Sequence, residues 1–385
     1  MPCRILVIAG ETSGDLHGSH LVKAMKALRP DLEFFGIGGD RMREAGVELQ
    51  FHIERLAYLG LAEVLRHMPP FLRVFRAMTE LLDRRRPELV ILIDYPGFNL
   101  RFAARAKRRG IPVFYYIAPQ VWAWGRNRIP KLARRVDRLA VILPFEEPIF
   151  REAGIDAHFV GHPIVEIAYD ETPREVFCQR LGLSPSSTIL GLIPGSRVQE
   201  VTRLLPEMSR LVRQWAGDDP HLVGVISKAP SVPEHVYRQY LQLAPPGRMF
   251  LTDQHYALLR NADVLVVASG TATLEAACIG TPFVIVYRVS PVTYHLAKSL
   301  ITLPYIGLVN VVAGRRIVPE FLQGDFRADK LRPVLRELLS DGEMRRQMRQ
   351  NLQEVRRSLG PPGAPRRAAE LALELLEGEG KGRVR

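Results

Sequence analysis

A carboxylate that could act as a general base follows an apolar run in the first half of the chain. Asp94 comes directly after residues 91–93, Ile-Leu-Ile, and a proline stiffens the turn two residues later. The run predicts a buried strand, and ligands of parallel α/β sheets bind at the carboxyl ends of the strands. Partial removal from water raises the pKa of such a carboxylate and lets it accept a proton from a hydroxyl. Alternatively, Asp94 caps a helix that begins near Asn99.

A loop in the second half of the chain has the composition of an anion-binding site. Gly195, Ser196 and Arg197 stand between a predicted strand and a helix that carries Glu200. A turn of small residues, a guanidinium and the free N–H groups of a helix N-terminus together suit a diphosphate. No Gly-Lys-Ser/Thr follows, so the loop is a poor match to a P-loop. A purely structural turn is the alternative.

A second loop of this kind follows one strand and helix later. Ser269, Gly270 and Thr271 can offer N–H and hydroxyl donors to a phosphate, and Glu275 lies one turn into the next predicted helix. A carboxylate at that position can accept hydrogen bonds from both hydroxyls of a ribose. The alternative for Glu275 is a solvated or capping carboxylate. Together, the two loops predict a nucleotide diphosphate site.

Other polar residues of the sequence are less specific. Residues 10–15 (GETSGD) join a strand to a helix but do not form the G-x-G-x-x-G pattern, so NAD binding is disfavoured. Asn310 and Gln323 stand among apolar residues, where they could contact a base or sugar or could satisfy backbone groups. The three cysteines are far apart and lack metal-ligand spacing, so we expect neither disulfides nor a zinc site.

The composition is that of a globular protein with a basic surface. The 385 residues include 53 Lys and Arg against 41 Asp and Glu, a net charge of +12, and the isoelectric point is near 9.9. Such a charge favours nucleic acid, phosphate-bearing substrates or an anionic membrane as partners. A run of only six apolar residues, 5–10, separates Arg4 from Glu11, which is too short for a signal-peptide core, and the longest uncharged stretches, 110–125 and 299–314, fall short of a spanning helix. We therefore expect a cytoplasmic protein with peripheral membrane contact at most.

Short apolar runs alternate with helical patterns in both halves, which predicts two parallel sheets covered by helices. The expected first-half strands are 4–9, 33–37, 89–93, 113–117 and 139–143, with helices near 15–28, 71–86 and 99–109. The expected second-half strands are 189–193, 222–226, 249–251, 264–267 and 283–286, with helices near 198–215, 256–261, 272–279 and 291–301. The fold class is therefore α/β, with two Rossmann-like domains facing a central cleft. We expect domains at 1–165 and 166–340, and helices at 341–385 that cross back or swap to a partner.

A segment at 58–76 combines large apolar residues with arginines around a Pro-Pro break. Two short amphipathic helices with basic flanks suit the headgroup boundary of an anionic bilayer, although the same spacing is also typical of core helices. The residues of this expected membrane patch are Leu59, Leu61, Val64, Leu65, Arg66, Met68, Phe71, Leu72, Arg73, Phe75 and Arg76.

The ordered set of motifs resembles the lipid-A-disaccharide synthase family between about residues 4 and 376. The motifs that carry the resemblance are residues 10–15, 93–99, 119–124, 143–146, 161–163, 194–197 and 269–275, with Asn310 and residues 319–323. The resemblance implies a GT-B glycosyltransferase on the cytoplasmic face of the inner membrane of a Gram-negative-type cell. It implies a β(1→6) bond between UDP-2,3-diacylglucosamine and 2,3-diacylglucosamine 1-phosphate (lipid X), formed with inversion and without a metal or other cofactor.

The resemblance also implies roles for individual residues. Asp94 falls at the general-base position, Arg197 at the diphosphate position, Glu275 at the ribose position and Asn310 at a position important for activity. Gly195, Ser196, Glu200, Ser269, Gly270 and Thr271 complete the expected donor site, and the expected acceptor contacts are Glu11, Ser13, Asn99 and Gln120. One departure concerns Gly97, where some members carry a second Asp. A homodimer is compatible with this reading.

Three other functions are consistent with parts of the sequence. A UDP-N-acetylglucosamine 2-epimerase would share the nucleotide loops but would need no membrane patch. A peptidoglycan glycosyltransferase is also basic and peripheral, with an undecaprenyl diphosphate lipid as acceptor. A nucleic-acid-binding protein would fit the charge, but the arginines are scattered through predicted helices and no recognition motif is present, so we expect no nucleic acid partner.

Overall fold

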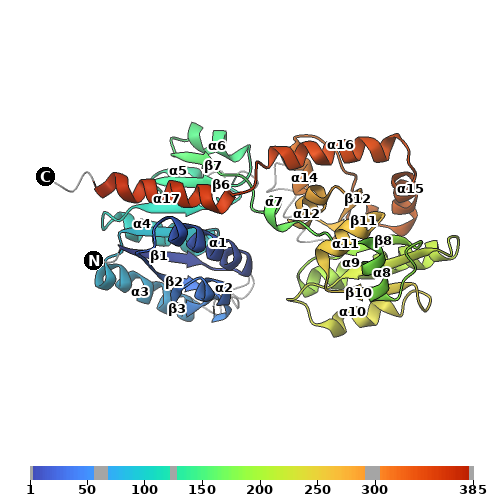
Figure 1. The fold of residues 1–385 in the computed structure, drawn as a ribbon. Helices are drawn as coiled ribbons and strands as arrows, with labels where there is room; N and C mark the ends of the chain where they lie inside the picture. Colours follow the sequence, from blue (N-terminus) through green and yellow to red (C-terminus); the bar gives the residue numbers. More distant parts are fainter. Residues whose placement is uncertain (1–2, 56–67, 122–127, 291–303, 381–385) are drawn as a thin grey trace. The chain divides into compact units, whose positions relative to one another are not determined.

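A computed structural model describes residues 3–55, 68–121, 128–290 and 304–380 (Figure 1). The chain forms two compact units, one made of Met1–Pro163 with Gly360–Arg385 and the other of Ile164–Leu359. The first boundary lies within three residues of the expected one. The second lies at Leu359/Gly360 rather than at 340/341, so the helix at 343–358 belongs to the second unit and only the last helix returns to the first.

The first unit is built on a seven-stranded sheet in which every paired strand is parallel, in the order β3-β2-β1-β4-β5-β6-β7. This order is that of a dinucleotide-binding Rossmann sheet extended by one strand. The strands are β1 (Cys3–Ala9), β2 (Leu32–Gly38), β3 (Val47–His52), β4 (Leu89–Ile93), β5 (Val113–Tyr116), β6 (Arg138–Val141) and β7 (Ala157–Phe159). Because β1 pairs with β4, Ala9 lies beside Ile93, and the loops after both strands meet at one edge.

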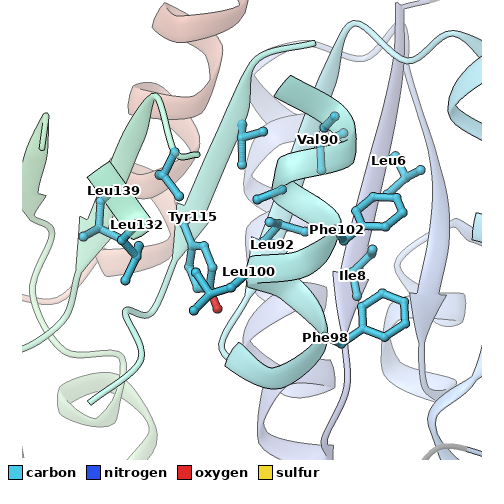
Figure 2. Close-up of a cluster of buried hydrophobic side chains, with 14 of the residues drawn as sticks. Leu6, Ile8, Val90, Leu92, Phe98, Leu100, Phe102, Tyr115, Leu132 and Leu139 are labelled. Atoms are coloured by element: carbon cyan, nitrogen blue, oxygen red, sulfur yellow. The ribbon is translucent and has the colours of Figure 1, made fainter. Parts of the chain in front are cut away.

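Helices cover both faces of this sheet. They are α1 (Thr12–Leu28), α2 (Asp40–Glu44), α3 (Met68–Arg85), α4 (Pro96–Lys107), α5 (Ile129–Ala133), α6 (Glu146–Glu152) and α17 (Ala364–Gly380), with a short 3-10 turn at Ile53–Arg55. Alternate residues of each strand face opposite layers, so Leu6 and Ile8 of β1 join one buried cluster and its other apolar residues join a second. Figure 2 shows the first cluster, in which Phe98 and Phe102 of α4 pack beside the strands.

The second unit repeats this plan with six parallel strands in the order β10-β9-β8-β11-β12-β13. The strands are β8 (Thr188–Ile193), β9 (Leu222–Ser227), β10 (Met249–Thr252), β11 (Val264–Ala268), β12 (Phe283–Tyr287) and β13 (Glu320–Leu322). The helices are α7 (Ile164–Ile167), α8 (Arg174–Leu181), α9 (Val198–Ala216), α10 (Glu234–Leu241), α11 (His255–Asn261), α12 (Ala272–Ile279), α14 (Leu308–Ala313), α15 (Ala328–Leu339) and α16 (Glu343–Ser358), with a 3-10 turn at Gln323–Asp325.

The predicted α/β class and each predicted strand are present. Three strands that the sequence pattern does not predict, β3, β7 and β13, each lie at an edge of their sheet. Edge strands bury less of their surface than central ones. Accordingly, β3 mixes polar and apolar residues, and β7 and β13 have only three residues each, too few to show a pattern. The helix expected at 291–301 lies outside the described residues.

Candidate functional site

The turn that carries Asp94 has an unusual backbone. β4 ends at Ile93, α4 begins at Pro96, and between them both Asp94 and Tyr95 have positive φ, 43° and 46°. Residues with a Cβ rarely adopt this left-handed conformation, and such strain concentrates at functional sites. The N-cap of α4 is Tyr95 and no side chain caps it, so the alternative that Asp94 caps this helix is not what the structure shows.

Buried hydrogen bonds hold the strained turn in place through its backbone. The Asp94 amide donates to the carbonyl oxygen of Tyr116 (3.2 Å), and the Asp94 carbonyl accepts from the Tyr115 hydroxyl and from Nδ2 of Asn99 (2.8 Å). Nδ2 of Asn99 also donates to the carbonyl of Ile93 at 3.1 Å. Asn99 is fully buried, so in this structure it supports the turn. Its expected contact with the acceptor stays a prediction that these contacts do not favour.

The carboxyl group of Asp94 lies in a poorly solvated environment, close to the negative charge of Glu11. Burial, and secondly the carboxylate of Glu11, raise its pKa to about 6, although a hydrogen bond from the Tyr95 amide opposes the rise. Glu11 reaches it because β1 and β4 are neighbours in the sheet. A carboxylate with this pKa ionises just below neutral pH and remains basic enough to take a proton.

The loop of residues 10–15 contributes close packing as well as charge. A Cβ on Gly10 would lie 2.3 Å from ring atoms of Tyr95, so only glycine lets the two loops approach. Asp15 is buried and accepts from the amides of Gly39 (2.6 Å), Arg41 (3.2 Å) and Met42 (3.1 Å), so it caps α2. By contrast, Glu11, Ser13 and Gln120 of the expected acceptor site are exposed.

In the second unit, Glu200 organises the loop at the start of α9. One of its oxygens accepts from the amides of Ser196 (2.9 Å) and Arg197 (3.2 Å), and the other lies 3.3 Å from Nη1 of Arg197. Gly195 has φ of 103°, and a Cβ there would lie 2.3 Å from the Glu200 carboxylate. Glu200 therefore shapes the loop from within. The Arg197 side chain is 77% exposed, which leaves its guanidinium accessible to an anion.

The loop after β11 divides into anchored and accessible residues. Ser269 donates its amide to Val286 (3.0 Å) and its hydroxyl to Ile306 (2.9 Å), so both of its donors are engaged within the protein. Gly270 and Thr271 are exposed, and a Cβ on Gly270 would meet nothing within 4 Å. The expected donation from Ser269 to a phosphate is thus not available in this arrangement, whereas the next two residues can approach a ligand.

Asn310 and Glu275 have different surroundings. Asn310 is fully buried, donates to Val318 (2.8 Å) and Glu320 (2.9 Å), and accepts from the amides of Ile317 (2.9 Å) and Val318 (3.0 Å). With its amide fully hydrogen-bonded, it supports the fold, and direct contact with a donor stays a prediction that these bonds do not favour. Glu275 is 18% exposed and is held by His255 and Tyr256, two residues that the sequence reading did not single out.

The described part of the predicted membrane patch has two faces. Phe71 and Phe75 of α3 are partly buried, with their rings 5.4 and 5.3 Å from that of Phe98, so they contribute to the core. Leu72, which is 53% exposed, and the exposed Arg73 and Arg76 project from the other face. Leu59, Leu61, Val64, Leu65 and Arg66 lie outside the described residues, as does the side chain of Met68.

The chain matches known proteins over nearly its whole length. The family model described as Lipid-A-disaccharide synthetase matches residues 5–374. The chain belongs to the lipid-A-disaccharide synthase family. The lipid-A-disaccharide synthase of Myxococcus xanthus (strain DK1622) is 42% identical over 375 residues, 97% of this chain and 98% of the relative. The chain is therefore an enzyme, a glycosyltransferase of lipid A biosynthesis.

The solved structures similar to this family member share its fold. The calicheamicin glycosyltransferase CalG4 aligns with a TM-score of 0.61 at 18% identity, covering 99% of both chains. A UDP-GlcNAc 2-epimerase from Neisseria meningitidis aligns with a TM-score of 0.58 at 11% identity, covering 97% of this chain and 100% of the epimerase. The GT-B fold is thus common to transferases and epimerases, and the family match separates the two classes.

The described residues contain no group of three or more His, Cys, Asp or Glu side chains arranged to hold a metal ion. In the same residues, no helix combines the length and apolar character needed to cross a bilayer.

Proposed function

We propose that this enzyme joins UDP-2,3-diacylglucosamine to lipid X through a β(1→6) bond, with inversion at the anomeric carbon and release of UDP. The observation that carries the proposal is the Asp94 turn. A family motif residue stands there on a strained backbone, in a partly desolvated place that raises its pKa to about 6. Structural carboxylates are usually paired or hydrogen-bonded so that the charged form is favoured, whereas at Asp94 burial and Glu11 outweigh the hydrogen bond from the Tyr95 amide and favour the neutral form.

In the proposed mechanism, Asp94 accepts the proton of the acceptor 6-hydroxyl as that oxygen attacks the anomeric carbon. The bond from the anomeric carbon to the UDP oxygen breaks on the opposite face, and its electron pair leaves with UDP. The leaving diphosphate gains negative charge, which the exposed Arg197 guanidinium and the amides near Gly270 and Thr271 can stabilise. Glu200 supports this site by shaping the loop that presents Arg197.

The acyl chains of both sugars suggest where the reaction takes place. We infer that the enzyme works at the cytoplasmic face of the inner membrane, where an anionic surface attracts basic residues. Exposed Leu72, Arg73 and Arg76 on α3 support this inference, since an apolar side chain flanked by cations suits a headgroup boundary.

The decisive experiment supplies purified enzyme with radiolabelled UDP-2,3-diacylglucosamine and lipid X, and separates the products by chromatography. Formation of a tetra-acylated disaccharide 1-phosphate, with UDP released in equal amount, supports the proposal. Parallel reactions contain UDP-N-acetylglucosamine alone, or with an undecaprenyl diphosphate acceptor. Turnover confined to either parallel reaction would exclude the proposed substrates.

A further inference from the structure

Four side chains at the carboxyl edge of the second sheet form a continuous hydrogen-bonded chain. Ser227 ends β9, His255 begins α11 just after β10 and is followed by Tyr256, and Glu275 lies in the first turn of α12, after β11. The Ser227 hydroxyl lies 2.8 Å from Nδ1 of His255, whose Nε2 lies 3.0 Å from Oε2 of Glu275. The Tyr256 hydroxyl donates to Oε1 of Glu275 at 3.1 Å.

These hydrogen bonds hold the Glu275 carboxylate by both of its oxygens. A carboxylate offers about four lone-pair sites, two on each oxygen, and one site on each oxygen is taken here. The rings of His255 and Tyr256 pack edge to face at 5.1 Å, which limits the movement of both donors. One acceptor site is left on each oxygen, and the side chain is 18% exposed. This pair of acceptors matches two neighbouring hydroxyls.

The contact with Ser227 is consistent with an N–H at Nε2 of His255, the ring nitrogen that faces Glu275. The carboxylate can only accept, so Nε2 of His255 must carry the hydrogen. Nδ1 of the neutral ring then accepts from the Ser227 hydroxyl, which is buried with its residue at 5% exposure.

We propose that His255 and Tyr256, with Ser227 behind His255, are positioning residues that orient Glu275 toward the 2′- and 3′-hydroxyls of a nucleoside diphosphate. The inference rests on the proposed function, in which Glu275 contacts the ribose of the UDP-sugar. It adds a specificity device, since the fixed carboxylate distinguishes a ribose from a deoxyribose. A site built to hydrogen-bond a hydroxyl is left with an unpaired acceptor when that hydroxyl is missing.

The test compares UDP with 2′-deoxy-UDP by titration calorimetry on the full-length protein. Wild type binds UDP more tightly than 2′-deoxy-UDP. In His255→Ala and Tyr256→Phe, UDP affinity falls about fivefold, corresponding to one net hydrogen bond, while 2′-deoxy-UDP affinity changes little. His255→Gln restores most of the discrimination because its amide nitrogen can replace Nε2 as a donor. His235→Ala, the same substitution at an exposed site on α10, has no effect on either ligand.

The outcomes separate this inference from the proposed function. A wild-type protein that binds neither nucleotide contradicts the UDP-sugar site itself. If wild type binds both nucleotides equally, or if the variants weaken both to the same extent, the positioning role of His255 and Tyr256 is overturned. Thermal melts accompany each titration, and Tyr256→Phe and His255→Gln provide the answer should His255→Ala fail to fold.

Discussion

Asp94 in the first unit and Glu275 in the second each follow a buried strand of a parallel sheet, but their side chains have different surroundings. Glu275 is held by a histidine and a tyrosine. Among the described residues no side chain donates to the Asp94 carboxylate, a neighbouring Glu11 opposes its charge, and its backbone is strained. The difference corresponds to two tasks. A binding carboxylate needs a fixed orientation, whereas a base must bind a proton during the reaction.

The largest effect should come from removing the proposed base. Asp94→Asn is expected to lower the turnover number by a factor of about 10²–10⁴, the usual contribution of a general base, with UDP affinity nearly unchanged. Turnover is measured with saturating substrates and affinity by calorimetry. An Asp94→Asn enzyme that retains turnover would show that another group takes the proton.

The same variant tests how much the ionised Asp94 destabilises the folded protein. In the folded state the pKa of Asp94 is raised to about 6, so its contribution to the free energy of unfolding is lost as pH rises from near 4 through about 6. At pH 7 the ionised carboxylate is therefore unfavourable. Asn removes this charge and tolerates positive φ, so the free energy of unfolding should rise by about 1–2 kcal/mol. Denaturant melts at pH 7 measure it, and a less stable variant would contradict the assigned burial.

A smaller effect is expected at the diphosphate loop. Arg197→Ala should weaken UDP binding about tenfold, since a charge-assisted contact contributes about 1.5–3 kcal/mol and this side chain is exposed. The melting temperature should stay close to that of wild type, because the loop is shaped by Glu200. Arg213→Ala, in the exposed last turn of the same helix, is the control and should bind UDP normally.

The charge of Glu11 sharpens the comparison through pH. Glu11→Gln removes the repulsion that raises the pKa of Asp94, so that pKa should fall and the acid limb of the kcat/KM profile should move to lower pH. Glu33→Gln, exposed on β2, should leave the profile where it is in wild type. A limb that stays in place in Glu11→Gln would mean that another group controls it.

The smallest effect is expected at Gly97, where the family resemblance leads us to compare this chain with an aspartate at the same position. It is exposed in the first turn of α4, and a Cβ there would meet nothing within 4 Å. Gly97→Asp should therefore fold normally and gain about 0.5 kcal/mol from the helix N-terminus. Because a side chain at position 97 meets no neighbour, we expect turnover within about twofold of wild type. A large loss or gain of turnover would show that this position takes part in the reaction.

The strands and the loops that follow them can be predicted from the sequence, whereas the contacts of the polar residues cannot. Apolar runs predict buried strands because burial depends on local composition, and the loops after them follow directly. From the sequence, Asn310 could contact the donor or satisfy backbone groups, and the structure shows it buried with its hydrogen bonds made inside the protein. Ser269 likewise has both donors engaged by distant segments, at Val286 and Ile306.

The sequence by itself determined the alternation of strands and helices, the residue types at the end of each strand and the family to which the chain belongs. Only the tertiary structure decided which of those residues are held and which are free to react. Strand order brings Glu11 to Asp94 and His255 to Glu275 across tens of residues of sequence. Solvation and hydrogen bonding, which set the reactivity of a carboxylate, depend on neighbours in space, and local sequence does not encode these.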